Sequence, residues 1–443
     1  MNLNQQHKHI MTKPLRVLCS AQPFGYGPIA ELIGLERALR QDARGAEAQL
    51  LLQHNGHHTA LLNEVRDRFA LIEVAPGEPS LESLLNDPAL QEVDAVLSSY
   101  DSAAVFYGWF INRPTFFYDG LFWFWQFEQY RHCVPEYLDS LRLMRERGDA
   151  GTFVETYRRL LETDYHLTVL LAYHLSTMAF VRNGLGVAAR LAAYPELAHK
   201  TQTVGAVIDP TMNGVHQEER THVLVSLSGS LAPLLTFEQN LTFARGALMF
   251  ALEAFATLNI DLPWHFCCHP KLYKALLAEG RFQRLPSRFS VTPSYDYRKN
   301  LDMIRRAFAL FISPGFSSIQ EAANFRTPVF FLPEQNGGQP AQLLMLREAG
   351  YDIFSCTVTD MICGGKASIA EADVEALYRG VESLWSGAMR PARIASLERF
   401  RAVLQEDTRH SVLIENQRNA AHKVFGDFAG AERVARRVLD VVT

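Results

Sequence analysis

The sequence predicts an α/β protein made of two doubly wound, Rossmann-like domains with a cleft between them. At 443 residues the chain is too long for one core, and two domains of roughly 200 residues each are expected. A buried strand, a glycine-containing loop and a helix follow one another twice, from Leu15 to Arg40 and again from Val223 to Leu258. A doubly wound domain begins with this order, so we expect a second domain to start after residue 222.

Strands and helices alternate through the first half, which predicts a parallel sheet. Residues 135–175 have apolar positions three and four apart and form a longer segment than a strand crossover needs. We therefore expect a helical insertion there that covers or shapes the cleft. The expected strands are Leu15–Ser20, Ala48–Leu52, Phe69–Val74, Ala95–Ser98, Thr115–Tyr118, Met178–Val181 and Thr203–Ile208.

The second half repeats this alternation after a polar segment. Residues 209–222 contain proline and glycine without periodicity, and they are the best candidate for an interdomain linker. We predict a disordered tail over 1–12, a first domain over 13–208, a second domain over 223–425 and a last helix over 426–443. The expected strands of the second domain are Val223–Leu227, Trp264–Cys268, Arg288–Val291, Ala309–Ser313, Val329–Leu332 and Ile353–Cys356.

The most informative stretch runs from Ala309 to Gly350 and predicts a strand, a loop, a helix, a second strand and another helix. Gly315 lets the loop backbone approach a ligand closely, and Ser317 or Ser318 can cap the helix that follows. The free N–H groups of the first helical turn are a site for an anion. Glu321, one turn further on, lies on the same face and could reach the hydroxyls of a ribose attached to that anion. An ordinary loop with a capped helix is the alternative interpretation.

These residues carry a family resemblance. The pattern S-x-G-x-x-S-x-x-E-A, then T-P-x-x-x-x-P, then a glycine-rich loop resembles the nucleotide-sugar half of GT-B glycosyltransferases. The peptidoglycan GlcNAc-transferase type and the plant natural-product type are the most similar in pattern. The resemblance implies that the serines contact a diphosphate, that Glu321 binds the ribose, and that Gln339 and Gln342 contact the donor sugar. Gly338 stands where many members have Asp, so the identity of the sugar stays open. The family also implies that the last helix crosses back onto the first domain.

Three other segments are expected to face the same donor. If the two halves close on each other, Ser228, Gly229 and Ser230 lie across the cleft from the Gly315 loop and help to hold the diphosphate. His269 follows a strand and could touch the diphosphate or the sugar, although a satisfied loop histidine is the commoner outcome. Tyr295 lies where GT-B families hold the base ring, a task that backbone contacts usually perform. No D-x-D motif occurs, so we expect neither a metal nor a cofactor, with the nucleotide-diphospho sugar as co-substrate.

The first domain is expected to bind the acceptor. GT-B enzymes have a glycine loop at the position of Gly25, Tyr26 and Gly27, and many carry a catalytic histidine there, where this chain has Tyr26 or Pro28. We therefore take Asp119 as the candidate base, because it ends a strand at the edge where α/β sheets bind ligands. A structural Asp that caps the turn with Gly120 is the alternative. Glu128 and His174 are weaker candidates for the base.

An aromatic stretch, YDGLFWFWQFEQY, begins at Tyr118. Its flat apolar rings allow three interpretations: core under a loop, the wall of an acceptor pocket, or a patch resting on a membrane surface. In the second interpretation Trp123 and Trp125 contact the acceptor.

Composition excludes several classes of function. A net charge of −5 gives no global field that favours nucleic acid. The six cysteines fit no zinc spacing, and they indicate reduced thiols of a cytoplasmic protein. No secretory signal or transmembrane run is expected, because no apolar run reaches roughly 18 residues. His54, His57 and His58 are interpreted as a solvated loop, since no further ligand lies at metal spacing.

The sequence thus predicts a hexosyltransferase-like glycosyltransferase. It would move a sugar from a UDP-linked donor to a small-molecule or natural-product acceptor, without metal and, by family analogy, with inversion. The alternatives are a nucleotide-sugar 2-epimerase or hydrolase of the same fold, and a non-catalytic sugar-nucleotide-binding partner subunit. The segments GYGP, YDGLFWFW and VGAVID also resemble, less strongly, the cytosylglucuronate synthase group. The oligomeric state is left open.

Overall fold

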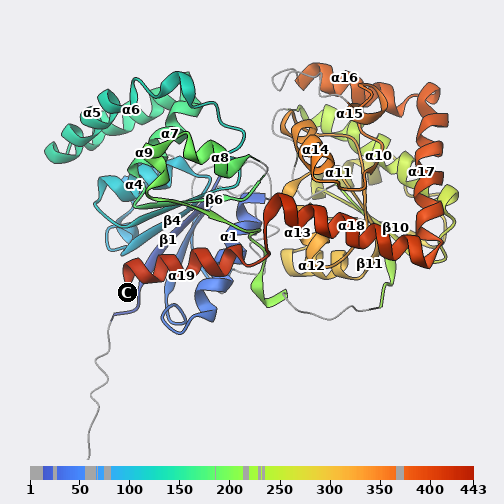
Figure 1. The fold of residues 1–443 in the computed structure, drawn as a ribbon, viewed down its shortest axis with the longest axis horizontal. Helices are drawn as coiled ribbons and strands as arrows, with labels where there is room; N and C mark the ends of the chain where they lie inside the picture. The colour runs from blue at the N-terminus through green and yellow to red at the C-terminus, as the bar shows by residue number, and fades with distance from the viewer. Residues whose placement is uncertain are drawn as a thin grey trace, which may run out of the picture.

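The computed structural model describes residues 13–22, 27–54, 66, 68–73, 81–184, 186–212, 219–227, 231, 235–365 and 374–443. Within these residues, two parallel sheets with helices on their faces lie side by side (Figure 1). The first half of the chain forms one sheet and the second half forms the other. The predicted class, two doubly wound α/β domains, is confirmed.

The first sheet has seven parallel strands in the order β3-β2-β1-β4-β5-β6-β7. Its central strand β1 pairs with β2 on one side and β4 on the other, so that Val17 lies opposite both Leu50 and Ala95. The strands are apolar runs because helices bury both faces of the sheet. Their bounds are β1 Arg16–Ala21, β2 Gln49–His54, β3 Ala70–Glu73, β4 Ala95–Ser99, β5 Thr115–Asp119, β6 Met178–Arg182 and β7 Thr201–Val204.

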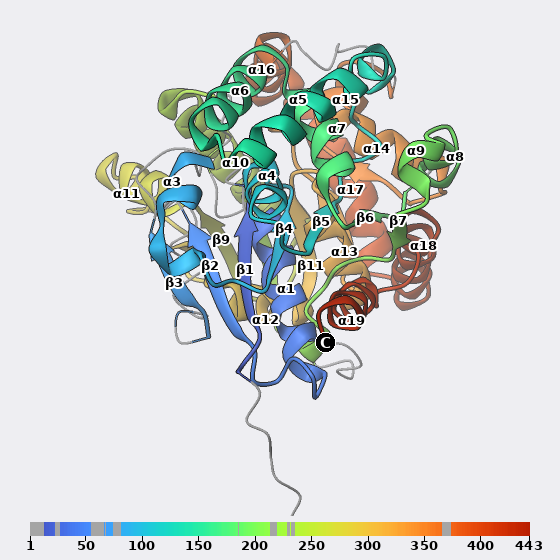
Figure 2. The ribbon, with the colours of Figure 1, turned by 90° about the vertical axis from the view of Figure 1, so that its left-hand side faces the viewer.

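The expected helical insertion of the first domain is three successive helices, α5 (Val134–Arg147), α6 (Ala150–Thr163) and α7 (Tyr165–Leu175), stacked above the sheet (Figure 2). Gly148 ends α5 in a left-handed conformation, and the side chains of Asp149 and Asp164 cap the next two helices. The other helices of this domain are α1 Gly27–Gln41, α3 Leu81–Asn86, α4 Ser102–Phe110, α8 Val187–Ala192 and α9 Pro195–Ala198.

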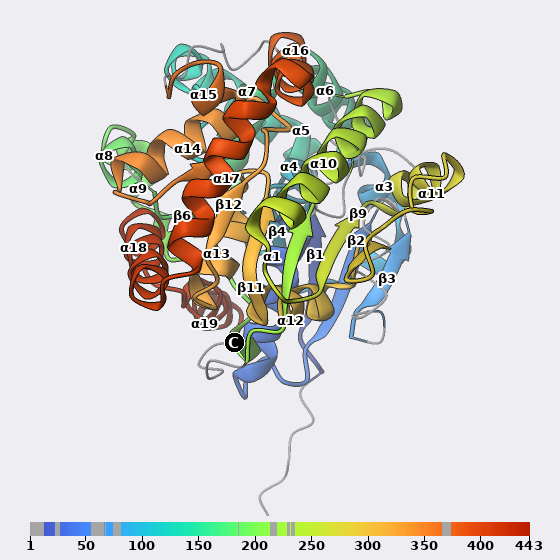
Figure 3. The same cartoon turned by 90° about the vertical axis from the view of Figure 1, so that its right-hand side faces the viewer.

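The second sheet has six parallel strands in the order β10-β9-β8-β11-β12-β13. Helices α10 and α17 lie side by side over one face (Figure 3), and α12 and α13 lie on the face turned toward the first domain. The bounds are β8 His222–Ser226, α10 Phe237–Leu258, β9 Trp264–Cys268, α11 Pro270–Ala278, β10 Phe289–Pro293, α12 Tyr297–Arg305, β11 Ala307–Ile312, α13 Phe316–Asn324, β12 Val329–Phe331, α14 Gly338–Glu348, β13 Phe354–Ser355, α15 Val358–Met361, α16 Val374–Trp385 and α17 Arg390–Leu404.

The chain passes between the domains twice. It leaves the first domain after β7 through a short 3-10 turn, Pro210–Met212, and it returns after α18 (Asp407–Phe425), so that α19 (Gly430–Val442) packs on α1 (Figures 1 and 2). The returning segment meets the departing one directly. The Gly430 N–H donates to the Ala206 carbonyl at 2.9 Å, and the Ala206 N–H donates to the Asp427 carbonyl at 2.7 Å. The two crossings therefore form one connection.

Buried apolar side chains form a continuous core across the domain boundary. One cluster includes Ile33 of α1, Ile319 of α13, Leu310 of β11 and Leu439 of α19. Because this core includes elements of both domains and the returning helix, it fixes the distance between the two sheets.

Helix α10 corrects the expectation that no segment is long and apolar enough to cross a membrane. Within the described residues it is the one helix that is long and apolar enough to cross a membrane by length and composition. Half of its apolar window is buried, and side chains such as Phe243 and Ala247 pack in the core of the second domain. This burial is typical of a core helix.

The packing of α19 on the first domain leads to a stability prediction. Replacing the fully buried Leu439 by Ala should lower the free energy of unfolding by about 2–5 kcal/mol, because it removes apolar contacts and leaves a cavity. Urea unfolding monitored by circular dichroism measures the change. Val441→Ala on the same helix is the matched control, since this valine is 42% exposed and its loss should change stability by less than about 0.5 kcal/mol. Equal effects of the two changes would contradict the packing.

Candidate functional site

A cavity of about 440 Å³ lies where the two domains meet. The first domain contributes the start of α1, the loop after β5, the start of α7 and the end of β6, whereas the second contributes the loops before α13 and α14. Apart from the start of α7, which follows α6, these segments lie at the carboxyl ends of strands, where open α/β sheets bind ligands. The described lining residues are Gln22, Gly27, Pro28, Tyr100, Leu121, Trp123, Phe124, Trp125, Tyr165, His166, Arg182, Gly315, Phe316, Ser317, Asn336, Gly337, Gly338, Gln339 and Gln342.

One wall of the cavity is the beginning of α13. Gly315 is the N-cap residue and provides no side-chain cap, so the expectation that Ser317 or Ser318 caps this helix is wrong. The Ser317 hydroxyl instead donates across the domain boundary to Glu31 Oε1 at 3.3 Å. The first-turn N–H groups of α13 consequently have no capping side chain among the described residues, and the positive end of the helix dipole lies at the cavity.

The glycine-rich loop before α14 forms an adjacent part of this wall. Asn336 accepts a hydrogen bond from the Gly338 N–H at 3.1 Å, and Gln339 accepts one from the Gln335 N–H at 2.5 Å. Gln342 lies one turn later, and its side-chain oxygen is buried and has no partner in the described part of the chain. The predicted residues Gly315, Ser317, Gln339 and Gln342 therefore lie together on one wall, as their spacing suggested.

Aromatic rings form the opposite wall. Trp123, Phe124 and Trp125 come from the loop after β5, and Tyr165 and His166 come from the start of α7. The ring centroids lie 5.7 Å apart for Trp125 and Tyr165, and 5.5 Å apart for Trp125 and His166. The phenyl ring of Phe124 stacks on the imidazole of His166, with centroids 6.4 Å apart. The insertion and the aromatic loop thus build this wall together.

The aromatic stretch has two roles in the structure. Phe122 and Phe127 are buried in the core of the first domain, where both pack against Tyr173. Trp123 and Phe124 lie at the cavity, and the ring of Trp123 is 5.8 Å from that of Phe316 in the second domain. Part of the stretch is therefore core under a loop, as one interpretation expected, and another part lines a cavity; that this cavity binds an acceptor stays a prediction.

Asp119 does not line the cavity. It is fully buried behind Trp125 and accepts three hydrogen bonds, each of 2.7 Å, from Trp125 Nε1, the Tyr173 hydroxyl and the Leu121 N–H. Burial raises the pKa of Asp119 above its usual value, although these hydrogen bonds oppose the shift. Both oxygens of this buried carboxyl group accept hydrogen bonds from the protein, so neither is open to a substrate proton. This geometry fits the structural alternative for Asp119 and does not fit the predicted base.

The weaker candidates for the base also lie outside the described lining. Glu128 accepts a hydrogen bond from the Tyr194 hydroxyl. Burial lowers the pKa of His174 to about 4, and its helix end is bound by Lys200 through the His174 carbonyl at 2.6 Å. Neither side chain is placed to act on a ligand in the cavity.

The sequence analysis missed the polar network that joins the two domains at the cavity. Arg182 donates to Glu31 at 2.7 Å and to the Gly120 carbonyl at 3.0 Å, and the Tyr100 hydroxyl donates to Glu31 at 2.7 Å. The Arg182 guanidinium also lies 5.2 Å from the ring centroid of Phe316 in the second domain. Glu31 occupies an ordinary helix position and Arg182 ends an apolar strand, so no local motif marked either residue.

Glu321 lies beside this network and not on the described lining. It is 6% exposed, and burial together with the nearby charge of Glu31 raises its pKa to about 8. Its contact with a ribose therefore stays a prediction.

The remaining predicted residues are distributed as follows. Gly27 lines the cavity, and a Cβ atom there would lie 3.2 Å from the Ser317 hydroxyl. His269 caps α11 by accepting a hydrogen bond from the Lys271 N–H at 3.1 Å, and Lys299 lies 4.7 Å from the ring centroid of Tyr295. Ser318 is partly buried in the first turn of α13. The predicted residues Gly25, Tyr26, Ser228, Gly229 and Ser230 lie outside the described residues, as do His57, His58 and the side chain of His54.

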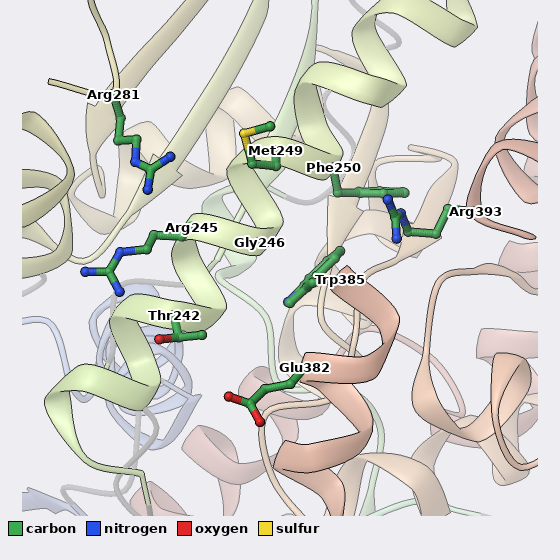
Figure 4. Close-up of a pocket in the computed structure, with 9 residues that line it drawn as sticks. All are labelled: Thr242, Arg245, Gly246, Met249, Phe250, Arg281, Glu382, Trp385 and Arg393. Carbon is green, nitrogen blue, oxygen red and sulfur yellow. The ribbon is translucent and has the colours of Figure 1, made fainter. Parts of the chain in front are cut away.

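A second cavity of about 330 Å³ lies between α10, α16 and the residues that follow α11 (Figure 4). Its three arginines are all paired with glutamates, Arg245 and Arg281 with Glu279, and Arg393 with Glu253. Each arginine that lines this cavity, in the part of the chain that is described, is therefore already paired with a carboxylate. None of the predicted site residues lines it.

Comparison with known proteins identifies the fold. No protein-family model and no curated protein sequence matches this chain. Solved structures do match, among them a putative UDP-N-acetylglucosamine 2-epimerase from Listeria monocytogenes, with 13% identity, a TM-score of 0.53, and coverage of 97% of this chain and 95% of that chain. MnaA of S. aureus with UDP has 12% identity, a TM-score of 0.52 and 97% coverage of both chains. UGT89C1 of Arabidopsis thaliana with UDP-L-rhamnose has 12% identity, a TM-score of 0.51, and coverage of 97% of this chain and 100% of that chain.

These similarities confirm the GT-B fold. Glycosyltransferases and 2-epimerases both occur among the structures that share it. These similarities show the fold alone, and a reaction for this chain has to be argued from its site.

The buried Glu321 leads to a pH prediction. Its carboxyl has a pKa of about 8 in the folded protein against a reference value of 4.5. Between these two pH values the unfolded chain releases the proton more readily than the folded protein does, so the free energy of unfolding falls as pH rises. Glu321→Gln removes this titration. The melting temperature of the variant minus that of the wild type should therefore increase as pH rises from about 5 to about 8. Thermal melts across this range measure the difference. Glu348→Gln, at an exposed glutamate, is the control; melting curves of Glu321→Gln that run parallel to the wild type would contradict the shift.

Proposed function

We propose that the protein is a glycosyltransferase that moves a sugar from a UDP-linked donor, held by the second domain, to a small-molecule acceptor held by the first. One observation carries this proposal. A single cavity joins the uncapped N-terminus of α13 and the glycine-rich loop on one side to a wall of aromatic rings on the other. A transferase needs both walls, because its two substrates must meet.

The donor side has the groups that a nucleotide-diphospho sugar requires. The first-turn N–H groups of α13 can hold a diphosphate, and the start of α1 at Gly27 faces the same space. Gln339 and Gln342 offer amide groups for the hydroxyls of the sugar. Backbone donors and helix dipoles can stabilise the leaving diphosphate as charge develops on it, and we propose that they do so without a metal.

The acceptor side excludes water and orients a nucleophile. Rings of Trp123, Phe124 and Trp125 can bury the acceptor against the donor sugar, so that one of its oxygen atoms attacks the anomeric carbon. Bond formation on one face of the sugar with departure of the diphosphate from the other would invert the anomeric centre. We propose this direct displacement.

We place the reaction in the cytoplasm. All six cysteines are free thiols, and Cys19, Cys267, Cys268 and Cys356 are buried. Reduced thiols are usual in a reducing compartment such as the cytoplasm.

Incubation with UDP-hexoses tests the proposal. With an aromatic acceptor panel present, the protein should form UDP and a glycosylated product, detected by coupled UDP release and mass spectrometry. Conversion of the UDP-sugar into its 2-epimer without acceptor would instead assign the epimerase reaction, and release of UDP that no acceptor accelerates would assign a hydrolase. Binding of UDP-sugars without any turnover would support the non-catalytic partner subunit.

A charge at the start of α13 should weaken donor binding selectively. Ser318→Asp places a carboxylate in the first helical turn, where it stabilises a free helix but repels a diphosphate. We expect the Kd for UDP to rise about tenfold or more, an increase that corresponds to about 1.4 kcal/mol.

Isothermal titration calorimetry measures this Kd. Ser318→Asn is the control of equal size without the charge, and it should bind UDP close to the wild type. A melting temperature of ligand-free Ser318→Asp at or above the wild-type value would show that the fold is intact. Equal affinities of the Asp and Asn variants would place the diphosphate elsewhere.

A further inference from the structure

The imidazole of the aromatic wall is arranged to donate a hydrogen bond to a ligand. His166 is the one imidazole on the described lining, and its Nδ1 accepts a hydrogen bond from the Gln126 backbone N–H at 3.1 Å. Because a backbone N–H can only donate, the neutral ring must carry its own proton on Nε2. In this tautomer Nε2 carries an N–H group that can donate a hydrogen bond. The lone pair on Nδ1, which could otherwise accept a proton, already accepts the Gln126 N–H.

Two buried carboxylates beside the cavity are also engaged. Asp119 accepts from Trp125, Tyr173 and Leu121, and Glu31 accepts from Arg182 and Tyr100. No carboxylate is found among the lining residues that the structure describes. The described wall therefore provides no group suited to take a proton from a neutral alcohol.

The shape of the wall favours a flat ligand. Its rings come from two segments and meet at angles, with Phe124 and Trp125 nearly perpendicular at 5.4 Å between centroids. Such an arrangement lets a planar ring stack on one side chain while the edges of others contact it.

We propose, on the basis of the glycosyltransferase function above, that the acceptor is a planar aromatic molecule whose nucleophilic oxygen is already ionised, an acidic phenol or an aromatic carboxylic acid. The oxyanion uses its electron pair to form the bond to the anomeric carbon. The bond from that carbon to the diphosphate oxygen breaks, and its electron pair leaves with the nucleoside diphosphate. The protein takes up no proton in this step.

The donors of the wall then have a defined task. The Nε2–H of His166 can donate to the acceptor oxyanion, and such charge-assisted hydrogen bonds are short and strong. A neutral alcohol of the same shape would bind the rings but would keep its proton, so it would react slowly.

Matched acceptors test this inference. The probes are 7-hydroxycoumarin and 4-nitrophenol, which ionise near neutral pH, 4-nitrobenzoic acid, and the neutral analogues 7-hydroxymethylcoumarin and 4-nitrobenzyl alcohol, each with a panel of UDP-hexoses. At pH 7 the ionised acceptors should react at least about a hundredfold faster than the alcohols, the loss that an absent general base produces. The 4-nitrobenzoic acid arm distinguishes a carboxylate from a phenolate acceptor.

The pH profile gives a second readout. For each phenol the rate should rise about tenfold per pH unit below the pKa of that phenol and then level off, so the midpoint follows the acceptor. Turnover of the alcohols within tenfold of the phenols, or one midpoint shared by all acceptors, would reveal a base in the protein and overturn the inference, while the transferase function would stand. Absence of turnover with every acceptor would overturn both.

Variants of His166 complete the test. His166→Gln keeps an N–H donor and cannot act as a base, whereas His166→Phe keeps a ring and loses the donor. With 4-nitrophenol, His166→Gln should retain more of the kcat/KM than His166→Phe, and UDP binding by both should match the wild type. Equal losses in the two variants would overturn the assigned donor. His57→Ala and His58→Ala are tested in the same way. If either variant loses activity and the pH midpoint does not depend on the acceptor, the protein supplies a base and the proposal of an ionised acceptor is overturned.

Discussion

The buried ion pair between Arg182 and Glu31 connects the two halves of the site. The Arg182 and Glu31 side chains are only 4% and 1% exposed, so removing their charges from water is costly. Mutual attraction, the Tyr100 hydroxyl and the Gly120 carbonyl offset this cost. The same pair contacts the second domain, where Glu31 accepts from Ser317 and the Arg182 guanidinium lies over the ring of Phe316. The start of α13 is therefore held in position by the end of β6 and by α1.

The continuous apolar core makes this arrangement rigid. Phe316, the first residue of α13, packs between Trp123 of the aromatic loop and Phe425 at the end of α18. The chain then crosses back to place α19 on α1, so the helix that begins at the cavity is also held by the returning segment. Movement of one domain against the other would have to disturb these aromatic contacts and the Arg182–Glu31 pair together. The α13 side of the cavity and its aromatic wall are thus coupled by packing.

The sequence predicted the sheets well because their signals are local. Apolar runs such as Trp264–Cys268 coincide with observed strands, and the glycine loops before helices lie at the carboxyl ends of strands, as topology requires. The α13 side of the cavity was predictable for the same reason, since Gly315 and Ser317 lie at the start of α13 and Gln339 lies at the start of α14, the next helix along the chain. The cap of α13 was not, because Ser317 turns to Glu31, 286 residues earlier in the chain.

The first-domain side of the cavity resisted prediction because its hydrogen bonds and ion pairs join distant segments of the chain. Arg182 meets Glu31 over 151 positions, and Tyr173 meets Asp119 over 54. A pattern within one helix or strand contains no information on such pairings. Asp119 looked like a catalytic group because it ends a strand at the ligand edge, which is also the position from which a carboxylate can hold the following loop.

The role of Asp119 explains how the aromatic wall keeps its shape. One of its oxygens accepts from both Trp125 and Tyr173, and the other accepts from the Leu121 N–H at the start of the same loop. Because Tyr173 belongs to α7, which also carries Tyr165 and His166, a single buried carboxylate joins both segments that line the wall. Such a group fixes the orientation of the rings without contacting the ligand. The first domain thus uses this buried carboxyl group for positioning, and it presents rings and hydrogen-bond donors to the cavity.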